Sequence, residues 1–329
     1  MSRGALFALF LGIAGVSLDG PQAPKSPAPA TTNLLLFAGG PGGMFRSRDW
    51  GGTWEKVKAG LEGLGAISGI TAAGPPVYAS GDGGLYVSED FGETWKPLYE
   101  KEAVVAFLIS RFPESDPTLF LGTTNGLLRS RDLGRTFEET SLRIPVLRIE
   151  WPGPDLVVVT QGGVVFTRTY GTSFQDPGLG LPGGETRALA FSSYFASDPV
   201  LFAASAGLGV FRSKDGGKHW AGVGLSGRVV SDMVWYGPIL YAASDAGLFK
   251  SESAGEKWVP LGEGLEGVIP QSLLFPLAPY AGSEVFLGTS NGVYHSLDGG
   301  AHWSLTGLKG ENVTVLATFP SSGKPPKKR

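Results

Sequence analysis

The octapeptide Ser88-Glu89-Asp90-Phe91-Gly92-Glu93-Thr94-Trp95 decides the fold, because its pattern, Ser-x-Asp-x-Gly-x-Thr-Trp, returns along nearly the whole chain. A period near 40 residues indicates one supersecondary unit per repeat, stacked against its neighbours. The chain of 329 residues can bury a large core as one such repeat domain. Whole or degraded copies begin, at intervals of 41, 42, 37, 46, 38 and 45 residues, at Ser47, Ser88, Ser130, Thr167, Ser213, Ser251 and Ser296.

Each residue type of the pattern suits a tight turn. Asp accepts hydrogen bonds from backbone amides two residues further on, and Ser does so more weakly. Gly adopts the positive φ that a side chain would penalise, and the final aromatic ring anchors the turn in the core. Five of the eight Trp residues stand at this final position. We therefore interpret as structural turn residues Ser47, Asp49, Gly51, Trp54, Ser88, Asp90, Gly92, Trp95, Ser130, Asp132, Gly134, Ser213, Asp215, Gly217, Trp220, Gly255, Trp258, Ser296, Asp298, Gly300 and Trp303.

Four short strands can be assigned to each repeat. In the fifth repeat strand A is expected at 187–192, strand B at 200–204 and strand C at 209–212, with strand D beginning at Trp220. The first repeat starts at strand B, near Leu34, whereas residues 312–319 form an additional strand A after the seventh motif. The sequence therefore predicts an all-β, seven-bladed β-propeller of four-stranded blades, closed by the C-terminal strand completing the first blade.

The repeated motif resembles the Asp-box, or bacterial neuraminidase repeat, over roughly residues 33–320. The resemblance implies a β-propeller in which the motif is a structural turn remote from any active site. It implies no single function, because Asp-boxes occur in sialidases, xyloglucan-type glycoside hydrolases, sortilin-like receptors and photosystem II assembly factors. It also disfavours the alternative that the motif carboxylates are catalytic groups or metal ligands.

Composition and the chain ends predict an exported protein. Residues 1–20 form a signal peptide or an N-terminal anchor, since Arg3 precedes an apolar run from Ala5 to Leu18 that is shorter than a spanning helix. Residues 21–32 form a proline-rich spacer, and residues 321–329 a basic disordered tail. Cysteine is absent, which excludes disulfides and thiol chemistry, and the net charge of −3 gives no footprint for nucleic acid. Membrane contact is expected only through an uncleaved anchor.

Strand order predicts where a ligand binds. The C–D turns, which carry the Asp-boxes, share one face with the A–B loops, so the D–A and B–C loops surround the channel mouth on the other face, where a site is expected. Strand A lines the channel, and an arc of arginines there could hold an anionic group. The alternative is that these charges pair with one another because burial requires it. The candidate ligand-binding residues are Arg148, Glu150, Arg187, Arg228 and Asp232.

Two functions remain open. The first is a non-catalytic binding or scaffold propeller for a protein or glycan ligand, with no catalytic residues, metal or cofactor expected. The second is a glycan-active enzyme, a glycoside hydrolase or sialidase-like protein, that uses a carboxylate pair such as Glu150 and Asp232. The resemblance to sialidases is incomplete, because their early Arg-Ile-Pro motif appears here only at residues 143–145, after the third repeat. Xyloglucan-type hydrolases place a cleft between two propellers, and this chain supplies one.

Overall fold

The structure is a computed structural model, and the predicted propeller range contains every residue that it describes. These are residues 35–71, 76–110, 115–151, 155–175, 181, 185–192, 195, 197–276 and 283–319. The predicted signal peptide or anchor, the spacer and the basic tail lie outside the described residues. No helix in the described part of the chain is long and apolar enough to cross a membrane.

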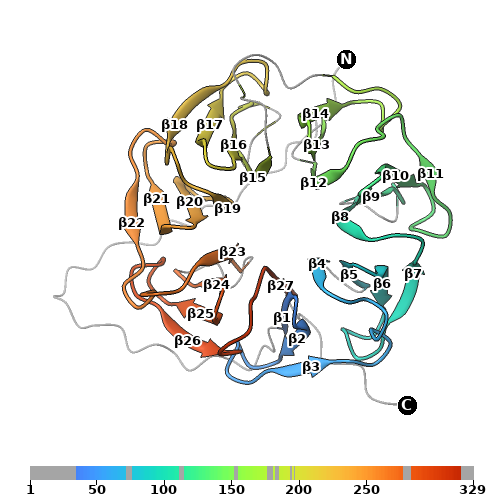
Figure 1. The fold of residues 1–329 in the computed structure, drawn as a ribbon, viewed down its shortest axis with the longest axis horizontal. Helices are drawn as coiled ribbons and strands as arrows, with labels where there is room; N and C mark the ends of the chain where they lie inside the picture. Colours follow the sequence, from blue (N-terminus) through green and yellow to red (C-terminus); the bar gives the residue numbers. More distant parts are fainter. Residues whose placement is uncertain are drawn as a thin grey trace, which may run out of the picture. The chain divides into compact units, whose positions relative to one another are not determined.

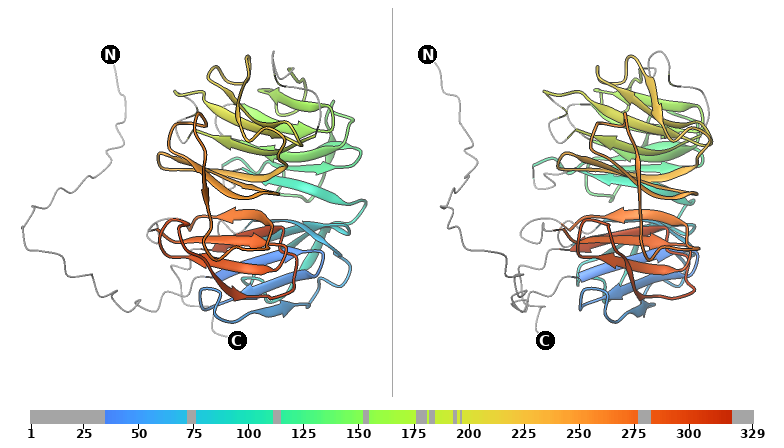
Figure 2. Two further views of the ribbon diagram at one scale, coloured as in Figure 1. Left: turned by 60° about the vertical axis from the view of Figure 1, so that its left-hand side comes forward. Right: turned by 90° about the vertical axis from the view of Figure 1, so that its left-hand side faces the viewer.

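Seven antiparallel sheets surround a central opening, which confirms the predicted seven-bladed β-propeller (Figure 1). Figure 2 shows the ring from the side, with neighbouring blades stacked face to face. The first three blades, each written from its inner to its outer strand, are formed by β27 (Val315–Phe319), β1 (Leu35–Gly40), β2 (Gly43–Ser47) and β3 (Glu55–Val57); by β4 (Ile67–Thr71), β5 (Val77–Gly81), β6 (Gly84–Ser88) and β7 (Lys96–Tyr99); and by β8 (Val104–Ile109), β9 (Leu119–Thr123), β10 (Gly126–Ser130) and β11 (Glu138–Glu139).

The remaining four blades follow the same order around the ring. They are formed by β12 (Val146–Glu150), β13 (Leu156–Thr160) and β14 (Gly163–Thr167); by β15 (Thr186–Phe191), β16 (Leu201–Ser205), β17 (Gly209–Ser213) and β18 (Ala221–Gly224); by β19 (Val230–Tyr236), β20 (Ile239–Ser244), β21 (Gly247–Ser251) and β22 (Val259–Leu261); and by β23 (Pro270–Leu274), β24 (Val285–Thr289), β25 (Gly292–Ser296) and β26 (Ser304–Gly307).

The C-terminal strand closes the ring, as the sequence predicts. β27 pairs antiparallel with β1, with Phe37 opposite Ala317, so the first blade joins both ends of the domain (Figure 1). The inner edge of β1 is therefore paired. Closure makes the stability of the first blade depend on residues about 280 positions apart in sequence.

The outer edge of the fourth blade is described only up to Gln175. Within the described residues its sheet has three strands, and at the outer edge Phe166 and Gln175 form an antiparallel bridge. This blade carries the degraded motif in which Thr167 and Thr169 replace the Ser and Asp. The sixth blade keeps its outer strand β22 although Ser253 replaces the Asp of its box, so the loss of the Asp alone does not remove an outer strand.

The hydrophobic core lies between blades. Strand B supplies fully buried rings in the first, third, fifth and seventh blades, from Phe37, Phe120, Phe202 and Phe286. Each apolar cluster draws on two neighbouring blades; one, for example, joins Phe37 and Met44 to Ile67 and Val77. Since sheet-to-sheet packing supplies most of the apolar burial, each blade is stabilised by its neighbours.

Candidate functional site

Backbone hydrogen bonds between loops establish the two faces that strand order predicts. B–C loops donate to D–A loops of the same face: Asp82 N donates to Ala66 O at 3.3 Å, and Asp245 N donates to Val229 O at 3.0 Å. On the opposite face, an Asp-box turn bonds an A–B loop, since Leu133 N donates to Pro117 O at 3.0 Å. The D–A and B–C loops thus form one continuous surface around the channel mouth.

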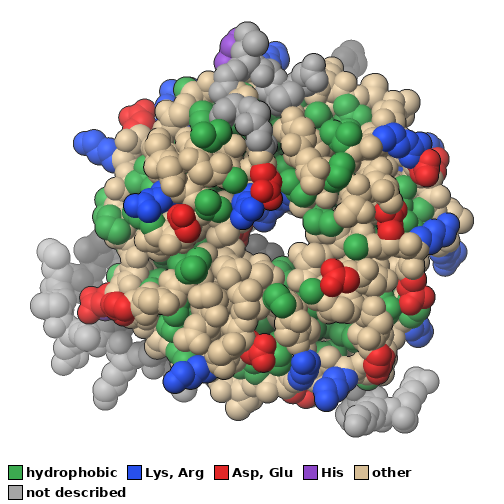
Figure 3. Space-filling model, in the orientation of Figure 1, with side chains coloured by type: hydrophobic (Ala, Val, Ile, Leu, Met, Phe, Trp, Pro, Cys, Tyr) green, Lys and Arg blue, Asp and Glu red, His purple; other side chains and the backbone are tan. Residues whose placement is uncertain are grey.

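An ion-pair cluster in the channel joins three of the five candidate ligand-binding residues. Arg148 on β12 lies 3.4 Å from Glu150 on the same strand and 3.2 Å from Asp232 on β19, two blades further round the ring. It also donates to the carbonyl of Arg187, at 3.1 Å, in the blade between them. Figure 3 shows acidic and basic side chains next to one another at the rim of the central opening. The intramolecular pairing that the sequence left as an alternative is present.

Asp232 has its acceptor sites occupied. Its Oδ1 accepts from Met233 N at 3.0 Å as well as from Arg148, and its Oδ2 accepts from Leu273 N of the seventh blade at 2.9 Å. The residue is 8% exposed, so these bonds replace those it would make to water. Asp232 therefore links the fourth, sixth and seventh blades.

Electrostatics keeps Arg148 charged. Burial alone would lower the pKa of this guanidinium, but the negative charges of Asp232 and Glu150 outweigh it and raise the pKa above its ordinary value. The cluster is therefore suited to holding strands together.

A bulge near the start of strand A explains why the predicted arc of arginines does not form. Ladder positions are skipped between Val146 and Arg148, and likewise between Val230 and Asp232, so Arg148 and Asp232 occupy equivalent positions. In the fifth blade the skip lies between Thr186 and Ala188, which places Arg187 in the bulge itself. Its side chain pairs instead with Glu185, at 2.9 Å. Bulges re-aim side chains, and this one could not be located from alternation alone.

Arg228 lies before β19 rather than in it. Its side chain is exposed, and among the described residues no ion pair joins it to the other four candidates. The structure thus brings Arg148, Glu150 and Asp232 together with the backbone of Arg187. It leaves the guanidinium groups of Arg187 and Arg228 outside that cluster.

The Asp-box turns have the structural geometry that the motif predicts, with one correction. In the second box Ser88 Oγ accepts from Gly92 N at 2.8 Å, and Asp90 Oδ1 accepts from Thr94 N, four residues further on and not two. The Thr94 hydroxyl donates to Asp90 Oδ2 at 2.6 Å, and Trp95 Nε1 donates to the carbonyl of Gly92 at 3.3 Å. The Asp carboxylate thus bonds the residue at the end of the turn, whereas the Ser hydroxyl bonds the Gly inside it.

These bonds stabilise the ionised carboxylates. The pKa of Asp132 falls to about 2 because Thr136 donates to it from both its side chain and its backbone. The pKa of Asp215 likewise falls to about 2, chiefly through the side chain of His219. Carboxylates saturated by their own turn in this way are structural. No group of three or more His, Cys, Asp or Glu residues that could hold a metal ion occurs in the described ranges.

Sequence reasoning missed a second left-handed residue in each box. The residue before the motif Gly also has a positive φ, which costs a side-chain-bearing residue free energy. Two boxes place Gly there, at Gly216 and Gly299, both with φ of 73°. The other five place Trp50, Phe91, Leu133, Tyr170 and Ala254, with φ between 51° and 60°. In the sequence, the Gly-Gly pairs at residues 216–217 and 299–300 indicate that two successive residues of the turn have a positive φ.

The comparisons with known proteins agree on the repeat and the fold. The family model of the BNR-Asp box repeat matches residues 85–98. No curated protein matches the chain. Among solved structures, YCF48 bound to D1 peptide is 18% identical with a TM-score of 0.58, covering 72% of this chain and 80% of that one. YCF48 from Cyanidioschyzon merolae is 14% identical with a TM-score of 0.59, covering 83% and 98%.

A propeller from an enzyme is also similar in fold. An ancestral GH74 enzyme is 13% identical with a TM-score of 0.67, covering 84% of this chain but only 45% of its own length. The chain thus spans less than half of that enzyme. At these identities the similarities establish the fold alone. From the repeat geometry, the sheet order and these matches together, the protein is a seven-bladed β-propeller built on BNR-Asp box repeats.

Proposed function

We propose that this protein is a non-catalytic binding propeller that engages a protein partner through its D–A and B–C loop face. The observation that carries the proposal is a set of exposed apolar side chains on the loops of that face. Ile144 is 41% exposed, Leu208 46% and Ile269 48%. They come from the D–A loop before β12, the B–C loop of the fifth blade and the D–A loop before β23. Exposed apolar residues held on short, mutually bonded loops are suited to contacting a protein.

Charged side chains between these apolar residues would supply orientation. Arg187 and Arg228 lie in the blades between Ile144 and Ile269 and are not held by the Arg148 cluster. Interfaces commonly combine an apolar centre with a polar rim, and arginine is enriched in them. YCF48, the structurally similar propeller bound to D1 peptide, supports a protein partner as the class of ligand.

The glycan-active alternative is weaker on chemical grounds. Hydrolysis needs one carboxylic acid that donates a proton and a second carboxylate that remains ionised. Glu150 and Asp232 share the same guanidinium, and Asp232 also accepts two backbone N–H groups. A screen of fluorogenic glycosides with the intact protein and with Glu150→Gln tests this alternative. Turnover that disappears in Glu150→Gln would overturn the binding proposal.

Export is the second part of the proposal. Arg3 and the apolar run Ala5–Leu18 support an export signal, with the chain acting outside the cytoplasm. Expression in a bacterial host followed by fractionation and mass spectrometry of the N-terminal peptide tests it. A mature chain beginning after residue 18 in the exported fraction agrees with the proposal, and so does an intact chain in the membrane fraction held by an anchor. An intact chain that remains in the cytosol contradicts it.

A further inference from the structure

Three boundaries between blades are held by an arginine from strand C. This arginine stands directly before the first Ser of its own Asp-box and donates from Nη1 to a carbonyl in the next blade. The acceptor is each time the left-handed residue before the motif Gly, whose carbonyl the turn leaves available. The three pairs are Arg46 with Phe91 at 3.0 Å, Arg129 with Tyr170 at 2.8 Å and Arg212 with Ala254 at 2.8 Å. We call this arrangement the arginine clasp.

Acidic residues surround each arginine clasp. Arg46 lies 2.6 Å from Glu55, the first residue of its own outer strand, and 3.0 Å from Glu93, which follows the motif Gly of the next blade. Arg129 uses the first of these positions, through Glu138, and Arg212 uses the second, through Glu256. Glutamate at one or both of two positions, the first residue of the outer strand and the residue after the motif Gly of the next blade, therefore pairs with the clasp arginine.

Three other boundaries are filled without an arginine. The ring of Phe166 lies against Gly217, where an added Cβ would come within 2.4 Å of it. Tyr241 donates its hydroxyl to the carbonyl of Gly299 at 3.2 Å. Between the seventh and first blades Trp50 of the first Asp-box stacks on Phe286, with 6.4 Å between ring centroids, and His295 stands in the arginine position.

The boundary between the second and third blades is different. Val87 stands in the arginine position, and the two acidic positions carry Lys96 and Arg135, so the charge of the clasp is reversed. A cavity of about 540 Å³ opens here, lined on one side by Tyr78, Val87 and Leu98. The opposite side is formed by the third Asp-box, including Leu133 and Arg135.

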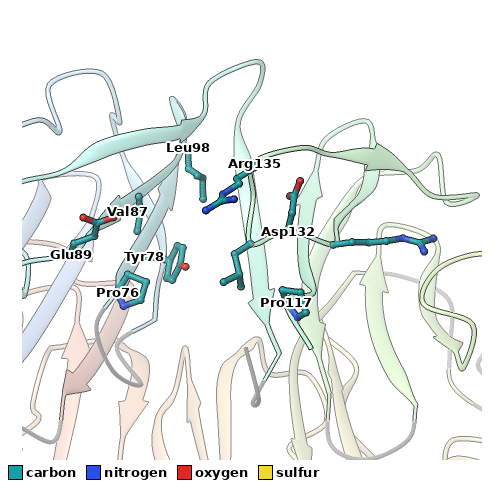
Figure 4. A pocket seen from close by; sticks show the side chains of 10 residues that line it. Pro76, Tyr78, Val87, Glu89, Leu98, Pro117, Asp132 and Arg135 are labelled. Carbon is teal, nitrogen blue, oxygen red and sulfur yellow. The ribbon is translucent and has the colours of Figure 1, made fainter. Parts of the chain in front are cut away.

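Three polar groups at this cavity have no hydrogen-bond or ion-pair partner in the described part of the chain. Among the described residues no hydrogen bond or ion pair engages the hydroxyl of Tyr78 or the guanidinium of Arg135, and none reaches the carbonyl of Leu133. The equivalent carbonyl is bonded by a side chain in four other blades. Figure 4 shows the guanidinium of Arg135 turned toward Leu98, above Tyr78, while the carboxylate of Asp132 points away. Two donors and one acceptor thus border an apolar space.

We propose that this boundary is a second binding site, which takes an acidic peptide segment of a partner protein. An apolar side chain of the peptide enters between Tyr78, Leu98 and Leu133, and a neighbouring Asp or Glu carboxylate pairs with Arg135. A backbone N–H of the peptide donates to the carbonyl of Leu133, as the arginine does in the clasp. Charge favours an acidic ligand because the guanidinium of Arg135 borders the cavity, while the two carboxylates of the lining are engaged: Glu89 lies 3.9 Å from Lys96, and Asp132 accepts hydrogen bonds from its own turn. The site lies on the Asp-box face, away from the proposed D–A and B–C loop interface.

The test measures binding of the fluorescein-labelled, amidated tetrapeptide Glu-Leu-Phe-Asp to the full-length protein by fluorescence anisotropy. A matched Gln-Leu-Phe-Asn peptide is the ligand control. We expect the acidic peptide to bind, and its affinity to fall about tenfold or more in Arg135→Glu, as loss of a charge-assisted pair implies. Arg168→Gln, which removes an exposed guanidinium paired with Asp155 in the fourth blade, is expected to leave binding unchanged.

A second variant rebuilds the clasp. Val87→Arg combined with Arg135→Glu gives this boundary the pair that Arg212 and Glu256 form between the fifth and sixth blades, so it should fill the cavity and abolish peptide binding without lowering the melting temperature. Equal binding of the acidic and neutral peptides overturns the proposal. No binding at millimolar peptide concentration, or full binding by both variants, also overturns it. Retained partner capture by Arg135→Glu would show that this site is separate from the loop face.

Discussion

Arg148 of the fourth blade donates to Asp232 of the sixth at 3.2 Å, across the fifth blade, where the equivalent position is Ala188. Only a small side chain at that position leaves room for the reach, and Ala188 is fully buried. The pair binds three consecutive inner strands into one unit, because Arg148 also bonds the backbone of Arg187.

Replacing Arg148 with Met should destabilise the ring. The change leaves Asp232 buried without its cationic partner, and we expect a loss of about 1–3 kcal/mol in the free energy of unfolding. Urea unfolding measures it, with Arg168→Gln as a control expected to change less than about 0.5 kcal/mol, since its pair with Asp155 is on the surface. The double variant Arg148→Met, Asp232→Asn should recover part of the loss. Equal, small effects of Arg148→Met and Arg168→Gln would contradict the role of the pair.

The motif glycine is predicted to be irreplaceable for packing as well as for φ. Gly92 has φ of 80°, and an added Cβ would come within 2.7 Å of the Phe37 ring in the neighbouring blade. Gly207 has a similar φ of 73° with nothing within 4 Å of an added Cβ. Both Ala variants carry the backbone strain, but Gly92→Ala should cost about 1–3 kcal/mol more because of overpacking. Thermal and urea unfolding of Gly92→Ala and Gly207→Ala measure the two losses in stability. Equal losses in the two variants would refute the packing role of Gly92.

Histidine in the Asp-box should make stability depend on pH near neutrality. The hydrogen bond and charge of Asp298, with Glu263, raise the pKa of His302 above its ordinary 6.5. A raised pKa in the folded state stabilises the protein fully below the unfolded value, and this contribution is lost as pH rises through the folded pKa. NMR titration of His302 should give a pKa above 6.5 that falls in Asp298→Asn. His302→Thr, which installs the residue used in the first three boxes, should flatten the pH dependence; a pKa at or below 6.5 in the unmodified protein would contradict this.

Ring closure predicts a sharp dependence on the last strand. A chain ending before Asn312 lacks β27, exposes the inner edge of β1 and should lose cooperative unfolding. A chain ending at Pro320 keeps β27 and removes only the basic tail, so it should unfold as the full chain does. Differential scanning calorimetry of the two chains measures this. An unchanged transition in the shorter chain would show that closure does not support the fold.

The sequence predicted the fold because the residues of each repeat themselves specify the geometry of its turn. Trp and Gly recur where the turn requires them. In the sequence the first repeat starts at strand B, and the additional strand A after the seventh motif therefore implied closure. The candidate site was harder, because strand alternation does not show bulges. Arg148 and Asp232 proved to be equivalent, whereas Arg187 lies in the bulge and turns away. The boundary at Val87 could be recognised only after the clasps at Arg46, Arg129 and Arg212 were seen to recur.

The most direct test of the binding proposal is a quantitative capture experiment on the loop face. A triple variant, Ile144→Asp, Leu208→Asp and Ile269→Asp, is compared with Val259→Asp, Leu297→Asp and Leu305→Asp, which alter exposed apolar residues elsewhere. Both are checked for an unchanged melting transition and then used with cross-linking and mass spectrometry to capture partners from the exported fraction. We predict that proteins captured by the unmodified chain are retained by the second variant and lost from the first. Equal capture by both variants, or loss confined to the second, would contradict the proposal.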